Sequence, residues 1–255
     1  MSVNASVKKG VLEVQDYFKL LGQIARGLTS RPVYFRDIIE QFDAIGIGSM
    51  TVVLLTGAFT GMVLALQSGV TLDQFGARAM VGRLVSATMV KELGPVLTAL
   101  MVTGRVGSGI AAELGSMMVT EQISALRALG TDPVRKLVVP RVLAGIVMVP
   151  ILTVIANGVG MVGAWIITVT QLGVSGGVFW NSVVQGLYIQ DVWMGLIKPF
   201  FLGFVIVTIG CHVGLRTSGG TQGVGRATTN AVVAGSVTVL AVDFLLTKLI
   251  LTLFY

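Results

Sequence analysis

Long apolar runs without any charge dominate the pattern of this chain. No charged residue occurs between Ala44 and Leu72, or between Val142 and Gln190. A membrane-spanning helix needs about 20 apolar residues, and both runs are longer. The hydrophobic pattern predicts five spanning helices, at about residues 45–67, 91–112, within 142–172, 192–215 and 231–254. The predicted fold class is therefore all-α integral membrane.

The first 43 residues have a different pattern. Apolar residues follow a helical spacing there, with charges between them: Val7, Val11, Val14, Phe18, Leu21, Ala25 and Leu28. A helix with one apolar stripe and this much charge is expected to lie in the plane of the membrane interface, ending near Arg31-Pro32. A coiled-coil or partner-binding helix is the alternative. We therefore divide the chain into a leader, 1–43, and a transmembrane domain, 44–255.

A short amphipathic segment, Met117–Pro133, separates the second and third predicted spans. It opens with Glu121 and Gln122, and its apolar residues recur at helical spacing: Ile123, Leu126 and Leu129. Gly130 and Asp132-Pro133 are expected to end it. A lone helix of about ten residues is marginal in water, so we expect this segment to dock on a soluble partner.

Basic residues indicate the orientation of the chain. Twelve of the eighteen Lys and Arg residues fall in segments 1–43, 113–141 and 216–230, whereas the opposite side carries only Arg78 and Arg83. Cytoplasmic loops are enriched in Lys and Arg. This bias predicts a cytoplasmic N-terminus, an external C-terminus and a cytoplasmic amphipathic segment. It also accounts for the net charge of +6 without nucleic-acid binding.

Several ionisable residues lie inside the predicted spans, where a charge costs about 2.5–3.5 kcal/mol at the bilayer centre, and four of them carry the argument. Glu92 is expected at the external end of its span, where it lines a cavity mouth or, alternatively, is an interfacial residue exposed to water or paired with Lys91. Arg105 is expected to reach lipid headgroups or Glu113. Two more, Lys198 and Asp243, lie at similar depths in different spans, and we expect an ion pair between them.

Motifs for catalysis or metal binding are absent from the sequence. The glycine-rich stretch 219–226 lacks the Lys-Ser/Thr of a phosphate-binding loop, so we expect a turn. His212 and the only cysteine, Cys211, are expected to be packed side chains, and a single cysteine excludes an internal disulfide. We therefore expect no catalytic residue, no metal and no cofactor in this chain. No cleaved signal peptide and no internal repeat is evident.

Several motifs, taken in order, resemble the MlaE-type permeases, the membrane subunits of MCE-associated phospholipid ABC transporters. They span roughly residues 45–250: Gly61-Met62-Val63-Leu64, Lys91-Glu92-Leu93-Gly94-Pro95, Gly104-Arg105-Val106-Gly107-Ser108, Ala112-Glu113-Leu114-Gly115, Val119-Thr120-Glu121-Gln122-Ile123, Leu129-Gly130-Thr131-Asp132-Pro133, Pro140-Arg141 and Arg226-Ala227-Thr228-Thr229. Each motif alone is weak, but their order and spacing together are specific.

The resemblance implies a permease that is not itself an enzyme and that moves phospholipids between the inner and outer membranes, which maintains outer-membrane lipid asymmetry. It implies a homodimer in the bacterial inner membrane, with ATP and magnesium on a separate ABC ATPase subunit. A hexameric MCE-domain protein would bind on the periplasmic side, and a STAS-domain protein often binds the ATPase in this family.

The resemblance also implies site residues. The coupling helix, about 117–130, would contact the ATPase through Glu121, Gln122, Leu126 and Arg127. The lipid would lie between two copies, against Leu64, Gln67, Leu72, Phe75, Glu92 and Leu93. Two alternatives remain at this point. One is an ion- or proton-coupled transporter that uses Glu92, Asp243 and Lys198, and the other is an integral-membrane enzyme acting on lipid headgroups.

Overall fold

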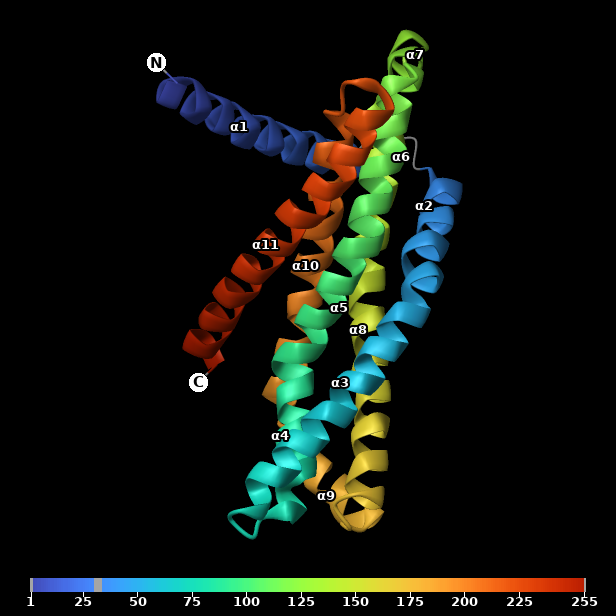
Figure 1. Cartoon of the computed structure of the whole chain (residues 1–255). Coiled ribbons are helices and arrows are strands. Elements are labelled where there is room, and N and C mark those ends of the chain that lie inside the picture. The colour runs from blue at the N-terminus through green and yellow to red at the C-terminus, as the bar shows by residue number, and fades with distance from the viewer. Residues whose placement is uncertain (1, 30–33, 255) are drawn as a thin grey trace.

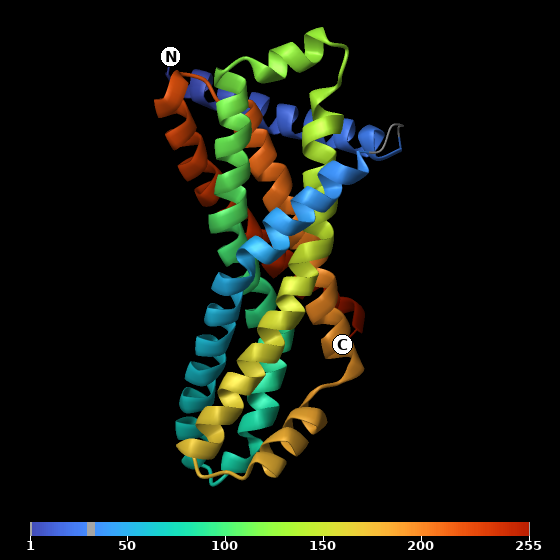
Figure 2. The same cartoon turned by 90° about the vertical axis from the view of Figure 1, so that its right-hand side faces the viewer.

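The protein is an all-helical integral membrane protein, and its computed structural model describes residues 2–29 and 34–254. In this part of the chain, five helices are long and apolar enough to cross a membrane. They form an elongated bundle with α7 (Gln122–Ala128) at one end and α9 (Gly176–Gly186) at the other, as Figures 1 and 2 show. We refer to these as the α7 end and the α9 end. The predicted helix break at Pro32 lies outside the described residues.

In the described residues, π-helical turns interrupt the first two spans and begin the third. The five spans contain these elements: α2 (Phe35–Phe42), η1 (Asp43–Ile47) and α3 (Gly48–Asp73); η2 (Arg78–Met80), α4 (Val81–Thr88), η3 (Met89–Leu93), α5 (Gly94–Val102), η4 (Thr103–Gly107) and α6 (Ser108–Val119); η5 (Val134–Val138) and α8 (Val139–Thr170); α10 (Ile189–Leu215); and α11 (Gly220–Phe254). All the η turns except η2 are π-helical. A π turn widens the helix locally and often marks a functional site.

Several details of the predicted spans and connections were wrong. The first span begins at Phe35 and the second at Arg78, so both helices extend beyond their most apolar stretches. The fifth begins at Gly220, which reduces the predicted loop 216–230 to four residues. The connection 173–191 contains α9, and Met118 and Val119 belong to α6 rather than to α7. Hydropathy detects only the part of a helix that is apolar enough for the hydrocarbon core of the membrane. These helices extend beyond that part.

The first helix, α1 (Ser2–Thr29), lies across the long axis of the bundle at the α7 end (Figures 1 and 2). Leu20 and Ile24 are buried against the bundle, whereas Val11, Val14 and Phe18 are exposed. Tyr17 bonds to the Thr208 hydroxyl at 2.8 Å. This arrangement, with an apolar face left open beside the ends of the spans, fits the predicted interfacial helix.

Glycines bring α3 and α8 into close contact along a stripe of small residues on α3: Gly57, Gly61 and Ala65. A Cβ atom on Gly57 would lie 2.7 Å from the Ala156 carbonyl oxygen, and one on Gly61 would overlap the Gly160 carbonyl. Ala65, the third member of the stripe, is fully buried. The stripe therefore serves packing within the chain.

Candidate functional site

The π turn η3 presents two charged residues, Lys91 and Glu92, in the middle of a long helix. Pro95, which follows one turn later, has no N–H to donate to a preceding carbonyl. The Lys91 carbonyl, four residues earlier, is thereby free to accept another donor. It accepts a hydrogen bond from the Lys198 ammonium group at 3.0 Å.

A glycine on α10 lets Lys198 reach this turn. A side chain at Gly195 would collide with the Val90 carbonyl, so α10 passes directly over η3. Lys198 lies one turn further along α10 and has no solvent exposure. Its long side chain is thus held inside the protein, where a charge must be paired.

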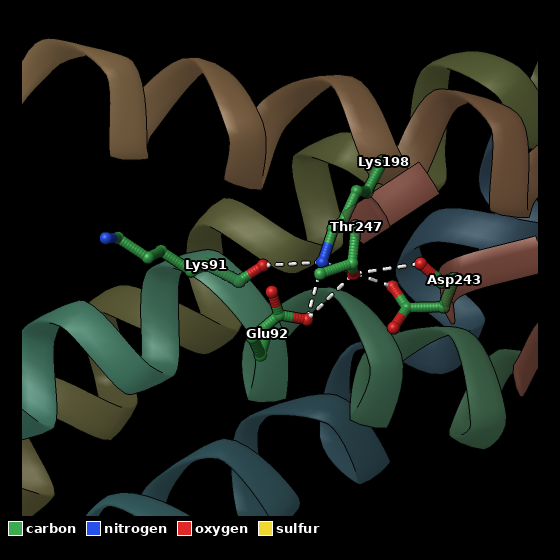
Figure 3. A network of polar contacts seen from close by, with 5 residues as sticks. All are labelled: Lys91, Glu92, Lys198, Asp243 and Thr247. Atoms are coloured by element: carbon green, nitrogen blue, oxygen red, sulfur yellow. Dashed lines mark hydrogen bonds and ion pairs between the residues drawn. The ribbon is translucent and has the colours of Figure 1, made fainter. Parts of the chain in front are cut away.

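Lys198 lies between two carboxylates from different spans, as Figure 3 shows. Its ammonium nitrogen is 2.6 Å from Glu92 Oε2 and 3.5 Å from Asp243 Oδ1. The Thr247 hydroxyl, on α11 with Asp243, donates to the same Glu92 oxygen at 3.2 Å. The predicted Lys198–Asp243 ion pair is therefore present. Glu92 and Thr247, which was not singled out in the sequence, complete what we call the charge cluster: Glu92, Lys198, Asp243 and Thr247.

Glu92 pairs with Lys198 and not with Lys91, so that one of the alternatives for Glu92 is wrong. The Lys91 ammonium lies 2.6 Å from Asp191 Oδ1 instead, and Asp191 is buried. Asp191 also accepts from the Tyr188 backbone N–H and so caps the start of α10. Neighbouring residues of the π turn thus bind separate acidic and basic partners on α10.

The charge cluster carries more negative than positive charge. One ammonium faces two carboxylates, and Asp243 Oδ1 has no hydrogen-bond partner among the described residues. Its distance of 3.5 Å from Lys198 exceeds the roughly 2.7–2.9 Å of a charge-assisted hydrogen bond. Glu92 is the accessible member, with 38% of its side chain exposed.

Arg105 lies in a second π turn, η4, and it does not pair with Glu113, one of its two expected partners. One of its guanidinium nitrogens donates to the Ala44 carbonyl at 3.2 Å and to the Ser49 hydroxyl at 3.1 Å. Ala44 belongs to η1, so two π turns on neighbouring helices are joined by this side chain. Glu113 instead pairs with Arg141 at 2.7 Å.

The amphipathic segment forms α7, which projects beyond the spans at one end of the bundle (Figure 2). Ile123 is buried and anchors it, and Leu126 is half-buried. Its polar residues Glu121, Gln122 and Arg127 are exposed. Glu121 has a left-handed backbone (φ 59°) and accepts a hydrogen bond from the Ser124 hydroxyl at 2.5 Å.

These features can be set beside known proteins. A profile of the family described as "Permease MlaE" matches residues 38–249. The chain belongs to the MlaE permease family. It is 35% identical over 245 residues to the Haemophilus influenzae "Intermembrane phospholipid transport system permease protein MlaE", which covers 93% of this chain and 94% of that protein.

Relatives in other bacteria are similar along most of their length. A Rickettsia bellii protein named "Probable ABC transporter permease protein" is 43% identical over 218 residues, covering 86% of this chain and 84% of the relative. A Synechocystis protein named a probable ABC transporter permease is 40% identical over 232 residues, covering 91% and 88%. The charge cluster and α7 both lie within the region matched by the family profile.

In this MlaE permease the predicted lipid positions divide into two groups. Leu64, Leu72 and Leu93 pack against one core cluster near the α9 end, which includes Met89 and Phe179. Gln67 and Phe75 are exposed instead, the latter at 78%. Leu93 also lines a small pocket between α3, α5 and α8, whose volume of about 10 Å³ is near the minimum for one water molecule.

Proposed function

We propose that the chain is the membrane subunit of an ABC transporter that moves phospholipids between inner and outer membranes and so maintains outer-membrane lipid asymmetry. One observation carries the proposal: α7 is a short helix between two spans, anchored by Ile123 and exposed along its polar side. A separate ATPase subunit would bind this surface and hydrolyse ATP there.

The connections of α7 would allow it to transmit force from a partner to the spans. Its neighbours are two long spans, α6 directly before it and η5–α8 shortly after it. On the η5 side, Lys136 forms an ion pair with Asp37 at 3.0 Å, which links the segment to the first span. Movement of α7 by a partner would therefore reach three spans at once.

The lipid itself would be held between two copies of the chain. The pocket beside Leu93 is far too small for an acyl chain, whereas lipid carriers need large apolar cavities with few polar groups. A homodimer that places the α3 and α5 faces opposite each other would enlarge this space. The name of the Haemophilus influenzae relative supports phospholipid as the substrate.

The proposal includes location and partners. The distribution of Lys and Arg favours an inner-membrane protein with a cytoplasmic N-terminus, an external C-terminus and cytoplasmic α7. A hexameric MCE-domain protein would then bind at the α9 end, and a STAS-domain protein would bind the ATPase. ATP and magnesium would be bound by the ATPase and not by this chain.

The direct test is a gentle purification of the tagged chain from its native membrane, followed by mass spectrometry of proteins and lipids. Recovery of an ATP-binding-cassette subunit, an MCE-domain protein and phospholipid supports the proposal. Recovery of a monomer without a nucleotide-binding subunit would overturn it.

The charge cluster favours a second candidate, an ion- or proton-coupled transporter. Glu92, Asp243 and Lys198 form a continuous polar contact across three spans, which is typical of proton relays in membranes. Transport that follows an ion gradient and persists without ATP would support this candidate. Transport that requires ATP and ignores the gradient would exclude it.

A further inference from the structure

We propose that α9 (Gly176–Gly186) is an interfacial helix that lies in the membrane surface at the α9 end and contacts the lipid bilayer through Trp180 and Val184. The occupant of this exposed apolar face is the lipid surface and not a soluble partner. The inference goes beyond the proposed function and holds for whichever lipid the chain moves.

The exposed apolar face of α9 lies beside its buried face. Phe179 and Val183 are buried in a core cluster that also contains residues of α4. One position further along the chain, Trp180 and Val184 are both exposed, Val184 at 71%. Residues four positions apart share one face of a helix. Trp180 and Val184 therefore form a single apolar face that the rest of the chain leaves open.

The next face around α9 is polar. Asn181 and Gln185, again four residues apart, are both exposed. Successive residues of a helix turn by about 100°, so the buried, apolar and polar faces follow one another around α9. A helix with this order of faces fits the boundary between hydrocarbon and water, where the apolar side enters the membrane and the polar side stays in water.

The tryptophans of the chain lie at the same level. All three of them, Trp165, Trp180 and Trp193, are found at the α9 end. Trp165, near the end of α8, packs against the start of α9, because a Cβ atom on Gly176 would lie 2.8 Å from its indole nitrogen. Tryptophan side chains gather where hydrocarbon meets water. Their position indicates that α9 lies at the membrane interface.

Exposed apolar residues also flank α9 on the two spans that it connects. Ile166 and Val169 are exposed in the last turns of α8, and Ile189 and Trp193 are exposed in the first turns of α10. These spans cross the membrane, so their exposed apolar side chains face lipid. Figure 2 shows α9 slanted relative to the spans at this end of the bundle. The lipid that surrounds α8 and α10 is therefore next to α9 as well.

Charge argues against a soluble partner on the apolar face. No charged residue occurs between Val142 and Gln190, so α9 and its connection to α8 offer no ion pair to a partner. The contrast is with α7, which exposes Glu121 and Arg127 in the position expected for a soluble subunit. An uncharged face with an exposed tryptophan instead fits the acyl chains just below the lipid headgroups.

The test uses the tryptophan fluorescence of the full chain in lipid nanodiscs. Trp165→Phe combined with Trp193→Phe leaves Trp180 as the only tryptophan. Phosphatidylcholine with bromine in the upper part of its acyl chain should quench roughly half of the Trp180 emission, because an interfacial helix enters the boundary between headgroups and acyl chains by about 5–10 Å. Bromine near the chain ends, and iodide in the water, should each quench much less.

A matched pair of variants tests the orientation of α9. In the chain that keeps only Trp180, Val184→Glu puts a charge on the apolar face, and Gln185→Glu puts the same charge on the polar face. Val184→Glu should reduce quenching by bromine about two-fold and increase quenching by iodide, whereas Gln185→Glu should leave both unchanged. Both variants keep Phe179 and Val183 in the core, so both should fold, as checked by circular dichroism.

The outcomes decide between the lipid surface and a soluble partner. Strong quenching of Trp180 by iodide, without quenching by bromine, would overturn the inference and assign the face to a partner in the water. Equal effects of the two variants would also overturn it. If Val184→Glu does not fold, the chain that keeps only Trp180 still decides through its two brominated lipids. The readout needs neither ATP nor lipid movement, so the inference and the proposed function fail separately.

Discussion

Lys198 donates a hydrogen bond to Glu92 across 2.6 Å, although the two residues are 106 positions apart in the sequence. The contact depends on the π turn η3 and on the Lys91 carbonyl, which Pro95 leaves without a backbone donor. It also depends on Gly195, which lets α10 pass close to η3. A fully buried lysine can stay charged here because its ammonium group donates to the Lys91 carbonyl and to Glu92 and lies 3.5 Å from the Asp243 carboxylate.

Replacement of Lys198 should therefore be more damaging than replacement of Glu92. Lys198→Met leaves two carboxylates facing each other, and removal of one partner of a buried ion pair costs about 3–5 kcal/mol. Glu92→Gln should cost much less, because Asp243 still faces the ammonium. Denaturant unfolding of the two purified variants measures this difference. Equal losses would contradict the assigned charge balance.

The contact between α3 and α8 gives a second prediction. Gly61→Leu should destabilise the protein by roughly 1–3 kcal/mol or more, since its side chain would occupy the position of the Gly160 carbonyl. Gly158→Ala, on α8, is the matched control because no atom lies within 4 Å of the added Cβ. Thermal unfolding should separate the two variants. A destabilised control, or an unaffected Gly61→Leu variant, would count against this packing.

Docking of α1 should depend on pH through Asp16. Its hydrogen bond with Lys19, together with the nearby Arg216 guanidinium at 2.8 Å, lowers the pKa of the Asp16 carboxyl. A lowered pKa means that this contact stabilises docking above the unfolded pKa of about 3.9 and is lost as the pH falls through the folded value. Above about pH 5 docking should be constant.

Spin labels at Gln15 and Ser218, both exposed positions, can measure this effect. The distance distribution between them should stay narrow down to about pH 5 and broaden below about pH 4. Asp16→Asn should show no step in that range. The change should be small because the pair is exposed to solvent, and a wild-type distribution unchanged at about pH 3 would disprove the role of Asp16.

Much of the fold could be predicted from the sequence. The hydrophobic pattern identified the number of spans, and the polar residues before Gly130 and Pro133 located the short helix between the second and third. The close contact of Gly57 and Gly61 with α8 needs the structure, because small residues at this spacing suit a second copy as well as a helix of the same chain.

The polar contacts inside the bundle could be predicted only in part. Depth along the spans suggested that Lys198 and Asp243 meet, but it could not show that Glu92 joins them or that Lys91 pairs with Asp191. Those pairings depend on which helices are neighbours and on the π turns, which rotate side chains without a clear sequence pattern. Pro95 was the one sequence feature that pointed to such a contact, since it leaves the Lys91 carbonyl in need of another donor.

The most direct test of the central claim is ATP-driven phospholipid movement in proteoliposomes that contain the chain and its co-purified ATPase. The wild-type complex should move lipid only with ATP. Glu121→Lys should keep the spans folded but abolish this movement, because it reverses the charge of an exposed residue at the start of α7. Unchanged transport in that variant, or transport driven by an ion gradient without ATP, would contradict the account.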